Sequence, residues 1–534
     1  MKKLFLSLIA GCSFAAPVCA QGTLSGDLQM NVNFFQRDSS INATTPTLYD
    51  RYLSGGEGWL SLRYNYKGFT ATVRVDAFHN SNLQNPTQAL SAFGIGAFSL
   101  SKEFKGLTIT GGYIYDQIGS GILFRAYEDR GLLIDNALVG LHLKYKLSDN
   151  IYLKGFTGQQ KVIRQNEVNG RYDPIIKGLS AEGDFSLGDK VHIVPGVGAL
   201  NRTIDQSSID AVVSNINNLD TGSRFIPQYN MYAFTAYNTL TAGDFSWYAE
   251  GAYKTHEAID DNGTLKDRSG NVLYSTLGYA RKGIAVNVTG KRTENFVMRT
   301  SPNEKLLNGV MNWQPVVARL RPQRLMARYT PASQDLSELA GGADVLISPN
   351  ETWNITLNYT HINTLKDVKL FREAYGELEY RSAEKFIVIG GVQYMQYNQE
   401  LYQQKALAPI VTAVTPFVEV TYRITPKKSI RAEVEYQHNE QDFGSWAYAL
   451  LEYNIAPRWS FTLADMYNVV PRESGVKKDG DGQHYPYVFM AYTQGPHRFT
   501  LAYVKQTEGI NCTGGVCRYE PAFSGVKLGI TSSF

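Results

Sequence analysis

The chain has 534 residues with 52 basic and 49 acidic side chains, a formal net charge of +3 and 19% charged residues. A charge this close to balance argues against a nucleic-acid-binding protein, which needs a clear excess of Lys and Arg; the charged fraction also lies below the ~25% of soluble domains. Beyond the N-terminus no apolar run reaches the ~18 residues of a membrane-spanning helix, so the sequence excludes helical spans in the mature chain.

The N-terminus has the order of an export signal. Lys2 and Lys3 form a charged head, an apolar stretch follows, and small residues lead to Ala20. We therefore expect residues 1–20 to be a signal peptide that is cleaved near Ala20. Residues 21–534 would then be the mature chain. A lipoprotein cleavage box at Cys12 and a short buried helix are the alternative interpretations of this segment.

Alternation of polar and apolar residues recurs along the mature chain in about 24 segments, most near the ~9–11 residues that a tilted strand needs to cross hydrocarbon. Successive side chains of a strand point to opposite faces, so each segment has one polar and one apolar face. The segment at 337–347 alternates least well. The clearest segments are 59–66, 69–79, 137–147, 229–240, 284–293, 352–361, 370–381, 386–397, 445–455, 459–467 and 499–505.

Short turns alternate with long polar connections along nearly the whole chain. The turns use Gly, Pro, Asn and Asp, the residues that tight hairpins demand. An up-and-down barrel explains this rhythm, because its short turns collect at one rim and its long loops at the other. A large secreted sandwich or propeller is the alternative. The expected long connections are 37–54, 116–135, 160–177, 201–228, 295–335 and 469–484.

The fold class that we predict is therefore all-β: a transmembrane antiparallel up-and-down β-barrel of about 24 strands, within a range of about 22 to 26. It would be a single multi-pass domain with long extracellular loops in the bacterial outer membrane. The apolar side chains of each strand would face lipid, and the polar side chains between them would face a water-filled interior. The charged residues that we expect on the lumen wall are Arg63, Arg74, Asp76, Arg431, Glu433 and Glu435.

The connection at 113–140 mixes many charged residues with large apolar ones, which a solvated loop tip would not need. Folding inward would let the apolar side chains pack on the wall while the charged ones face the pore and select solutes by charge. A surface loop whose ion pairs only hold its shape is the alternative, because it uses the same residue types. The candidate pore constriction consists of Arg125, Glu128, Asp129, Arg130 and Asp135.

The same connection resembles the signature of an uncharacterised outer-membrane β-barrel family of Bacteroidota. The resemblance implies the barrel fold and the outer-membrane location, but it brings no activity or substrate with it. The matching residues are Gly112-Tyr113, Tyr115-Asp116-Gln117, Gly119-Ser120-Gly121, Phe124-Arg125, Tyr127-Glu128-Asp129-Arg130 and Ile134-Asp135-Asn136.

The longest connection, 295–335, carries four arginines among apolar residues, and Pro315 and Pro322 prevent one long helix. An anion-attracting plug or lid is one interpretation, and a packed extracellular cap is the one that we favour. In the later connection at 469–484, Asp479 and Asp481 provide too few oxygen ligands for a Ca²⁺ loop, so the segment around them is expected to be a solvated tip. The four arginines are Arg319, Arg321, Arg324 and Arg328.

Only Cys512 and Cys517 remain after signal cleavage, and they flank a Gly-rich turn. In an exported chain this spacing predicts one local disulfide, and we see no further ligands nearby that would make a metal site. The chain ends in an amphipathic segment that closes with Phe534. This ending resembles the terminal strand by which bacterial outer-membrane barrels are recognised and inserted.

The leading functional hypothesis is a porin-like passive channel for small polar solutes, without cofactor or metal. The alternative is a non-conducting barrel that serves as scaffold or subunit of a larger outer-membrane complex, with a surface lipoprotein or another barrel as partner. A barrel hydrolase is a third hypothesis, although none of the eight histidines lies in a nucleophile motif. Outer-membrane lipid is the expected surrounding, no nucleic acid is expected, and the sequence leaves the oligomeric state open.

Overall fold

The computed structural model describes residues 22–83, 89–261, 263–305, 307–332, 336–382, 385–473, 476–477, 482–513 and 516–534. The expected signal peptide with Cys12 and Ala20 lies outside the described residues, and so do Asp479 and Asp481 of the expected solvated tip.

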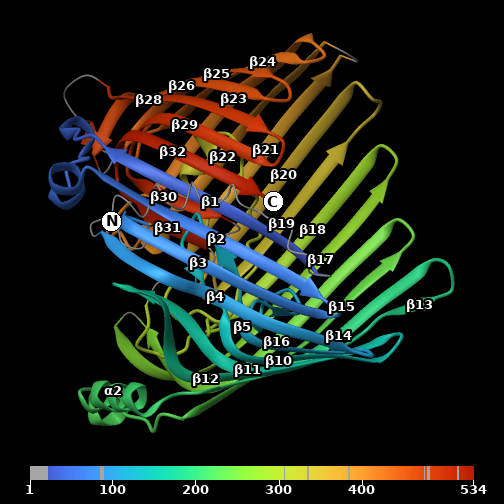
Figure 1. Cartoon of the computed structure of the whole chain (residues 1–534). Coiled ribbons are helices and arrows are strands. Elements are labelled where there is room, and N and C mark those ends of the chain that lie inside the picture. Colours follow the sequence, from blue (N-terminus) through green and yellow to red (C-terminus); the bar gives the residue numbers. More distant parts are fainter. Residues whose placement is uncertain are drawn as a thin grey trace.

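A single antiparallel sheet closes on itself to form a barrel (Figure 1). The strand β1 (Thr23–Phe35) pairs on one side with β2 (Ser54–Tyr66) and on the other with the last strand, β32 (Phe523–Ser533). Closure of this kind leaves no strand edge unpaired, which is the condition for a sheet in hydrocarbon. The predicted fold class is confirmed.

The wall has 24 strands in the part of the chain that the structure describes. Two further short strands belong to its neighbours, because β13 (Phe185–Leu187) continues β12 (Glu167–Gly183) and β27 (Val476–Lys477) pairs only with the end of β26 (Trp459–Glu473). The weakest expected strand is present as β19 (Glu338–Ile347). The strand count agrees with the prediction.

The other wall strands follow the chain in order. They are β3 (Phe69–Ser81), β4 (Leu90–Phe104), β5 (Leu107–Ile114), β10 (Leu138–Ser148), β11 (Ile151–Arg164), β14 (Val191–Thr203), β15 (Asn230–Ala242), β16 (Phe245–Asp261), β17 (Thr264–Arg281), β18 (Ile284–Glu294), β20 (Trp353–Thr364), β21 (Lys369–Arg381), β22 (Phe386–Asn398), β23 (Ile410–Thr425), β24 (Lys428–Asn439), β25 (Gly444–Ile455), β28 (His484–Gln494) and β29 (His497–Gln506).

The connections carry short helices and two-residue or five-residue strands. None of the helices among the described residues is long and apolar enough to cross a membrane. The helices are η2 (Ser39–Ile41), η3 (Thr47–Tyr52), α2 (Gln206–Asn217), η4 (Thr221–Ser223), η5 (Met326–Arg328) and α3 (Gln399–Gln403). The short strands are β6 (Gln117–Ile118), β7 (Phe124–Arg125), β8 (Glu128–Asp129), β9 (Ile134–Asp135), β30 (Gly509–Thr513) and β31 (Val516–Glu520).

Short turns and long connections lie at opposite rims, as the turn rhythm predicts. In Figure 1 the short-turn rim with β13 is on the right, and the long-loop rim with α2 is on the left. The amide of Gly26 donates to the carbonyl of Phe534 at 2.7 Å, so the C-terminus meets the start of β1 at the short-turn rim. An even strand number follows when both ends share one rim.

One expected connection, 160–177, is wrong. The strands β11 and β12 continue through it and turn only at Gln165 and Asn166. The extension is stabilised by packing rather than by solvent, because Ile163 and Val168 join a buried cluster with Trp59 of β2. The expected long connection at 469–484 is likewise shorter, since β26 runs on to Glu473.

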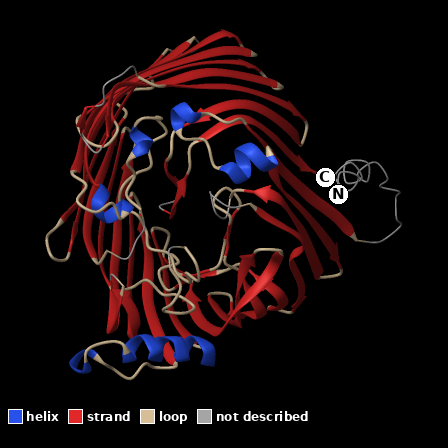
Figure 2. Ribbon diagram, turned by 90° about the vertical axis from the view of Figure 1, so that its left-hand side faces the viewer, coloured by secondary structure: helices blue, strands red, loops and turns tan. Residues whose placement is uncertain are grey.

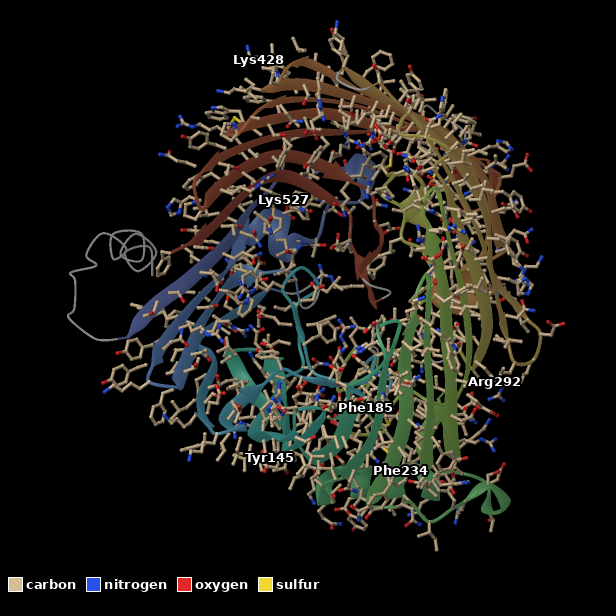
Figure 3. All side chains as sticks on the ribbon, turned by 90° about the vertical axis from the view of Figure 1, so that its right-hand side faces the viewer. Tyr145, Phe185, Phe234, Arg292, Lys428 and Lys527 are labelled. Atoms are coloured by element: carbon tan, nitrogen blue, oxygen red, sulfur yellow. The ribbon has the colours of Figure 1, made fainter. Side chains whose placement is uncertain are left out.

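Aromatic side chains surround the outer surface near both rims. At the short-turn rim the rings of Trp353 and Tyr380 pack with centroids 4.7 Å apart. Tyr145 lies at that end of β10, whereas Phe234 lies nearer the long-loop end of β15, and both rings are exposed on the outside (Figure 3). These positions match the two aromatic girdles of membrane barrels.

The predicted division into an outer apolar and an inner polar face holds on β24. The outward Val434 is 60% exposed, whereas the inward neighbour Glu435 is 1% exposed, and Glu433 is also buried. On β11 to β17 the division fails, because the inner face there carries Phe156, Ile176 and other apolar side chains. Their partner is a segment of the chain that folds into the lumen.

Candidate functional site

Two of the connections that the structure describes fold into the barrel and together form a plug. The inner loop, residues 115–137, joins β5 to β10; the long loop, residues 295–337, joins β18 to β19. Figure 2 looks in from the long-loop rim and shows loops and short helices inside the ring of strands. The two loops bond to each other: the amide of Trp313 donates to Gly121 at 2.9 Å, and Asn312 donates to the carbonyl of Ile122 at 3.0 Å.

The inner loop supplies the apolar core of the plug. Ile122, Leu123 and Phe124 are 0% exposed and pack against Phe156 and Leu200 of the wall. The rings of Phe124 and Phe156 have centroids 4.5 Å apart. Burying three large side chains contributes roughly 1.5–3 kcal/mol each. The packed core fills the side of the lumen that β10 to β17 enclose.

The wall residue Glu250 on β16 anchors the tip of the inner loop. Its carboxylate accepts hydrogen bonds from the amide of Ser120 at 3.1 Å and from the Ser120 hydroxyl at 2.5 Å. The neighbouring Gly119 has φ +56°, and a Cβ there would lie 2.9 Å from the Glu250 carboxylate. A non-glycine residue would therefore be strained twice, by its backbone and by the carboxylate.

A buried charge network holds the other end of the inner loop. Arg74 on β3 bonds to Asp76 at 2.6 Å and to Asp135 of the loop at 2.5 Å. Lys161 on β11 reaches the same Asp135 at 2.5 Å. Gly96 makes room for the network, since a Cβ there would meet the Asp76 carboxylate at 1.9 Å. Charges this deeply buried are stable only as partners of each other.

The predicted constriction residues divide into two groups. Glu128 bonds to Arg74 at 2.9 Å and to Arg130 at 2.8 Å, and Asp135 joins the same network. Arg125 instead lies over the ring of Trp313, 4.9 Å from its centroid, and Asp129 accepts from the amide of Leu132. Most of these contacts brace the loop. The charge-selective role of the five residues stays a prediction.

Asp116 anchors the start of the inner loop to β10 and β11. Its carboxylate lies 2.8 Å from His142 and 2.9 Å from Lys154. Burial alone would raise the pKa of Asp116, but the hydrogen bond with His142 and the charges of Lys154 and Lys144 outweigh burial and hold the pKa well below its ordinary value. The ionised form therefore stabilises the docked loop.

The variant Asp116→Asn is expected to lose stability at about pH 7, and the loss should shrink as the pH falls below about 4. The sign follows from the lowered folded pKa: the contribution is complete above the unfolded pKa and disappears as the folded carboxylate is protonated. Urea unfolding of the wild type and of Asp116→Asn at about pH 7 and about pH 3 measures the difference in their free energies of unfolding. Asp149→Asn, at an exposed turn, is the control. A stability difference that is equal at both pH values would contradict the prediction.

The long loop lies inside the barrel, along the inner face of the wall strands that do not contact the inner loop. The favoured interpretation of this loop as an extracellular cap is therefore wrong. Wall carboxylates draw the loop inward: Arg321 forms two bonds of 3.0 Å to Glu373, and Glu435 accepts from the amides of Arg324 and Leu325 at 2.7 and 3.0 Å. Arg319 pairs with Asp344 on β19 at 2.9 Å.

The remaining predicted wall residues also lie on the inner face. Arg431 bridges Glu419 at 2.8 Å and Glu433 at 3.0 Å. Arg63 is exposed at the inner face of β2. The sequence did not indicate two of the anchors, Lys161 and Glu250. The first lies in a segment interpreted as a loop; the second is the lone acid among apolar neighbours in a strand, which could have marked it as an inward polar residue.

Two hollows lie on the plug. The larger, about 1470 Å³, opens toward the long-loop rim between the plug and connections such as 403–405 and 506–509. The smaller, about 380 Å³, lies on the inner loop, at Tyr115, Asp116, Arg125 and Glu128. Among the described residues no group of three or more His, Cys, Asp and Glu side chains could hold a metal ion.

The hairpin of β30 and β31 carries Cys512 and Cys517. Its register places Cys512 directly opposite Cys517. The two side chains lie outside the described part of the structure, so the disulfide stays a prediction.

The family of unknown function DUF6029 matches residues 1–534. The chain belongs to this family. No curated protein matches the chain in sequence. The uncharacterised barrel family that the sequence resembles agrees with this result, while its bacterial group stays a prediction.

Several solved structures follow a similar course. The P pilus usher PapC translocation pore shares 9% identity at a TM-score of 0.44, over 96% of this chain and 99% of that chain. The siderophore receptor PirA from Pseudomonas aeruginosa shares 7% at 0.40, over 96% and 80%. The FrpB iron transporter from Neisseria meningitidis shares 10% at 0.40, over 96% and 81%. Likeness at this level assigns no function to this DUF6029 member.

Proposed function

We propose that the protein is a passive outer-membrane channel for small polar solutes, narrowed by its two-loop plug. The observation that supports this is the inner face opposite the plug core. There β21, β23 and β25 carry Glu377, Glu379, Glu419 and Glu452, which are only half-buried. Ionised carboxylates cost several kcal/mol each when they are taken out of water, so this side of the lumen is hydrated.

The hydrated wall and the packed plug divide the lumen into two functional halves. Solutes enter through the hollow of about 1470 Å³ at the long-loop rim. They then pass the long loop, which docks on Glu373 of β21 and Glu435 of β24, and leave along the charged short-turn ends of β21 to β25, while the side packed around Phe124 stays closed. The two-loop plug narrows the passage, which would limit it to small solutes. Glu128 and Arg130 of the inner loop, which contact β1 to β3, are the candidates for charge selection at its edge.

Planar-bilayer recording of the purified protein tests the proposal. We expect discrete conductance steps, and liposomes that contain the barrel should swell in small sugars but not in large ones. A bilayer that stays silent at every voltage, together with liposomes that do not swell, would refute the channel.

A second candidate function is a non-conducting scaffold within a larger outer-membrane complex. The observation that favours it is the packed plug core, because Ile122, Leu123 and Phe124 are fully buried inside the barrel. Crosslinking in native membranes tests this candidate. A stable partner protein is the expected result for a scaffold, and a barrel that crosslinks to nothing would count against it.

A further inference from the structure

The larger hollow has an excess of positive charge. Four of its cationic side chains have carboxylate partners: Lys161 with Asp135, Lys405 with Asp442, Arg518 with Glu520, and Arg321 with Glu373. The remaining lining cations are Arg324 and Arg328. Neither forms an ion pair with a carboxylate among the described residues. The remaining lining acid, Glu508, accepts a hydrogen bond from the Tyr519 hydroxyl at 2.7 Å.

The wall carboxylate that the long loop contacts beside this arginine pair is already occupied. Both oxygens of Glu435 accept backbone amides, those of Arg324 and Leu325, so the carboxylate fixes the loop rather than the arginine side chains. The guanidinium of Arg328 lies over the ring of Trp446, 4.2 Å from its centroid. A ring face positions a cation without cancelling its charge.

Both arginines line the hollow from a single turn of the long loop. They are four residues apart across the helical turn that includes η5, where the amide of Ala327 donates to Gln323 at 3.1 Å. Residues at this spacing are neighbours, and two like charges there destabilise the turn by a few tenths of a kcal/mol. Repulsion that is kept inside a hollow is relieved when an anion binds between the two groups.

We propose that this hollow binds a solute with an oxyanion group, a carboxylate or a phosphate, between Arg324 and Arg328. Guanidinium groups bind such groups through paired, charge-assisted hydrogen bonds. The rings of Tyr397, Tyr402, Phe443 and Tyr519 line the same hollow and offer apolar surface to the rest of the solute. The inference rests on the proposed function in treating the hollow as the channel entrance, but binding there does not require conduction.

Isothermal titration of the purified full-length barrel in detergent micelles, with inorganic phosphate and with succinate as probes, tests the inference. The double variant Arg324→Gln/Arg328→Gln should bind about tenfold more weakly or worse. Arg319→Gln is the matched control on the same loop, since Arg319 pairs with Asp344 and does not line the hollow. The double variant Arg324→Lys/Arg328→Lys keeps both charges but loses the paired guanidinium geometry, so its binding should fall between those of the wild type and the double Gln variant.

Three results would overturn the inference: no binding of either probe to the wild type, equal binding by the double Gln variant, or an equal loss in Arg319→Gln. A preference for phosphate or for succinate identifies which of the two oxyanions the hollow favours. Conductance from the bilayer experiment is scored separately. A barrel that conducts but does not bind refutes only this inference, and one that binds but never conducts refutes only the channel.

Discussion

Deletion of residues 121–131 is expected to raise the single-channel conductance several-fold. The deletion removes Ile122, Leu123 and Phe124, which fill the packed half of the lumen, and with them most of the candidate constriction residues. A barrel of ~24 strands is wide enough for a large aqueous lumen once its interior is cleared. Planar-bilayer recording of the variant beside the wild type measures the change.

The matched control is a deletion of the helix α2, which is of similar length. It lies outside the ring of strands at the long-loop rim (Figures 1 and 2), where Val212 and Ile216 pack on Ala258 and Leu265. Its loss should leave the conductance unchanged. Unchanged steps after deletion of 121–131, or equal increases in both variants, would remove the assignment of the inner loop as the obstruction.

The sequence predicts the wall well because strand alternation and turn chemistry are local. The alternation of polar and apolar residues within each strand indicates which face meets lipid, as in β24, where Val434 and Glu435 point to opposite sides. Where this alternation gives the wrong inner face, the cause is a segment from elsewhere in the chain that packs on the strand. On β11 the inward-facing position 156 holds an apolar residue, Phe156, because Phe124 of the inner loop packs against it.

The candidate site is predictable only in part for the same reason. Its charged residues are visible in the sequence, and the inner loop was expected to fold inward as one of two alternatives. Its anchors are not visible, because Glu250 lies 130 positions from Ser120 and Lys161 lies 65 from Gly96. Nothing local pairs residues at such separations. The course of the long loop depends likewise on distant carboxylates, Glu373 and Glu435.

The anchors also differ in kind, which decides how each responds to mutation. Glu250 holds the inner loop through the amide and hydroxyl of Ser120, and Glu435 holds the long loop through two backbone amides, so the loop side of each anchor is an uncharged group. The Arg74 network instead joins charges from three separate parts of the chain: β3, β11 and the inner loop. A single substitution there leaves opposite charges stranded in several elements at once.

The variant Arg74→Met is therefore expected to lose about 3–5 kcal/mol of unfolding free energy, the usual result of removing one partner from a buried ion pair. Arg74 is 5% exposed and Asp76 is 0% exposed, so water cannot replace the lost guanidinium. After the substitution Asp76 and Asp135 must share Lys161, which lies 3.6 Å from Asp76. Urea unfolding in liposomes measures the loss.

Two further variants separate charge from packing. Arg63→Met, on the inner face of the neighbouring strand but exposed, should change the free energy by no more than about 0.5 kcal/mol. The double variant Arg74→Met/Asp76→Asn should recover part of the loss, because it also removes one of the stranded carboxylates. Two results would contradict this prediction: a free energy of unfolding of the single variant equal to that of the wild type, or a double variant less stable than the single one. Either would mean that the network does not hold the inner loop by its charges.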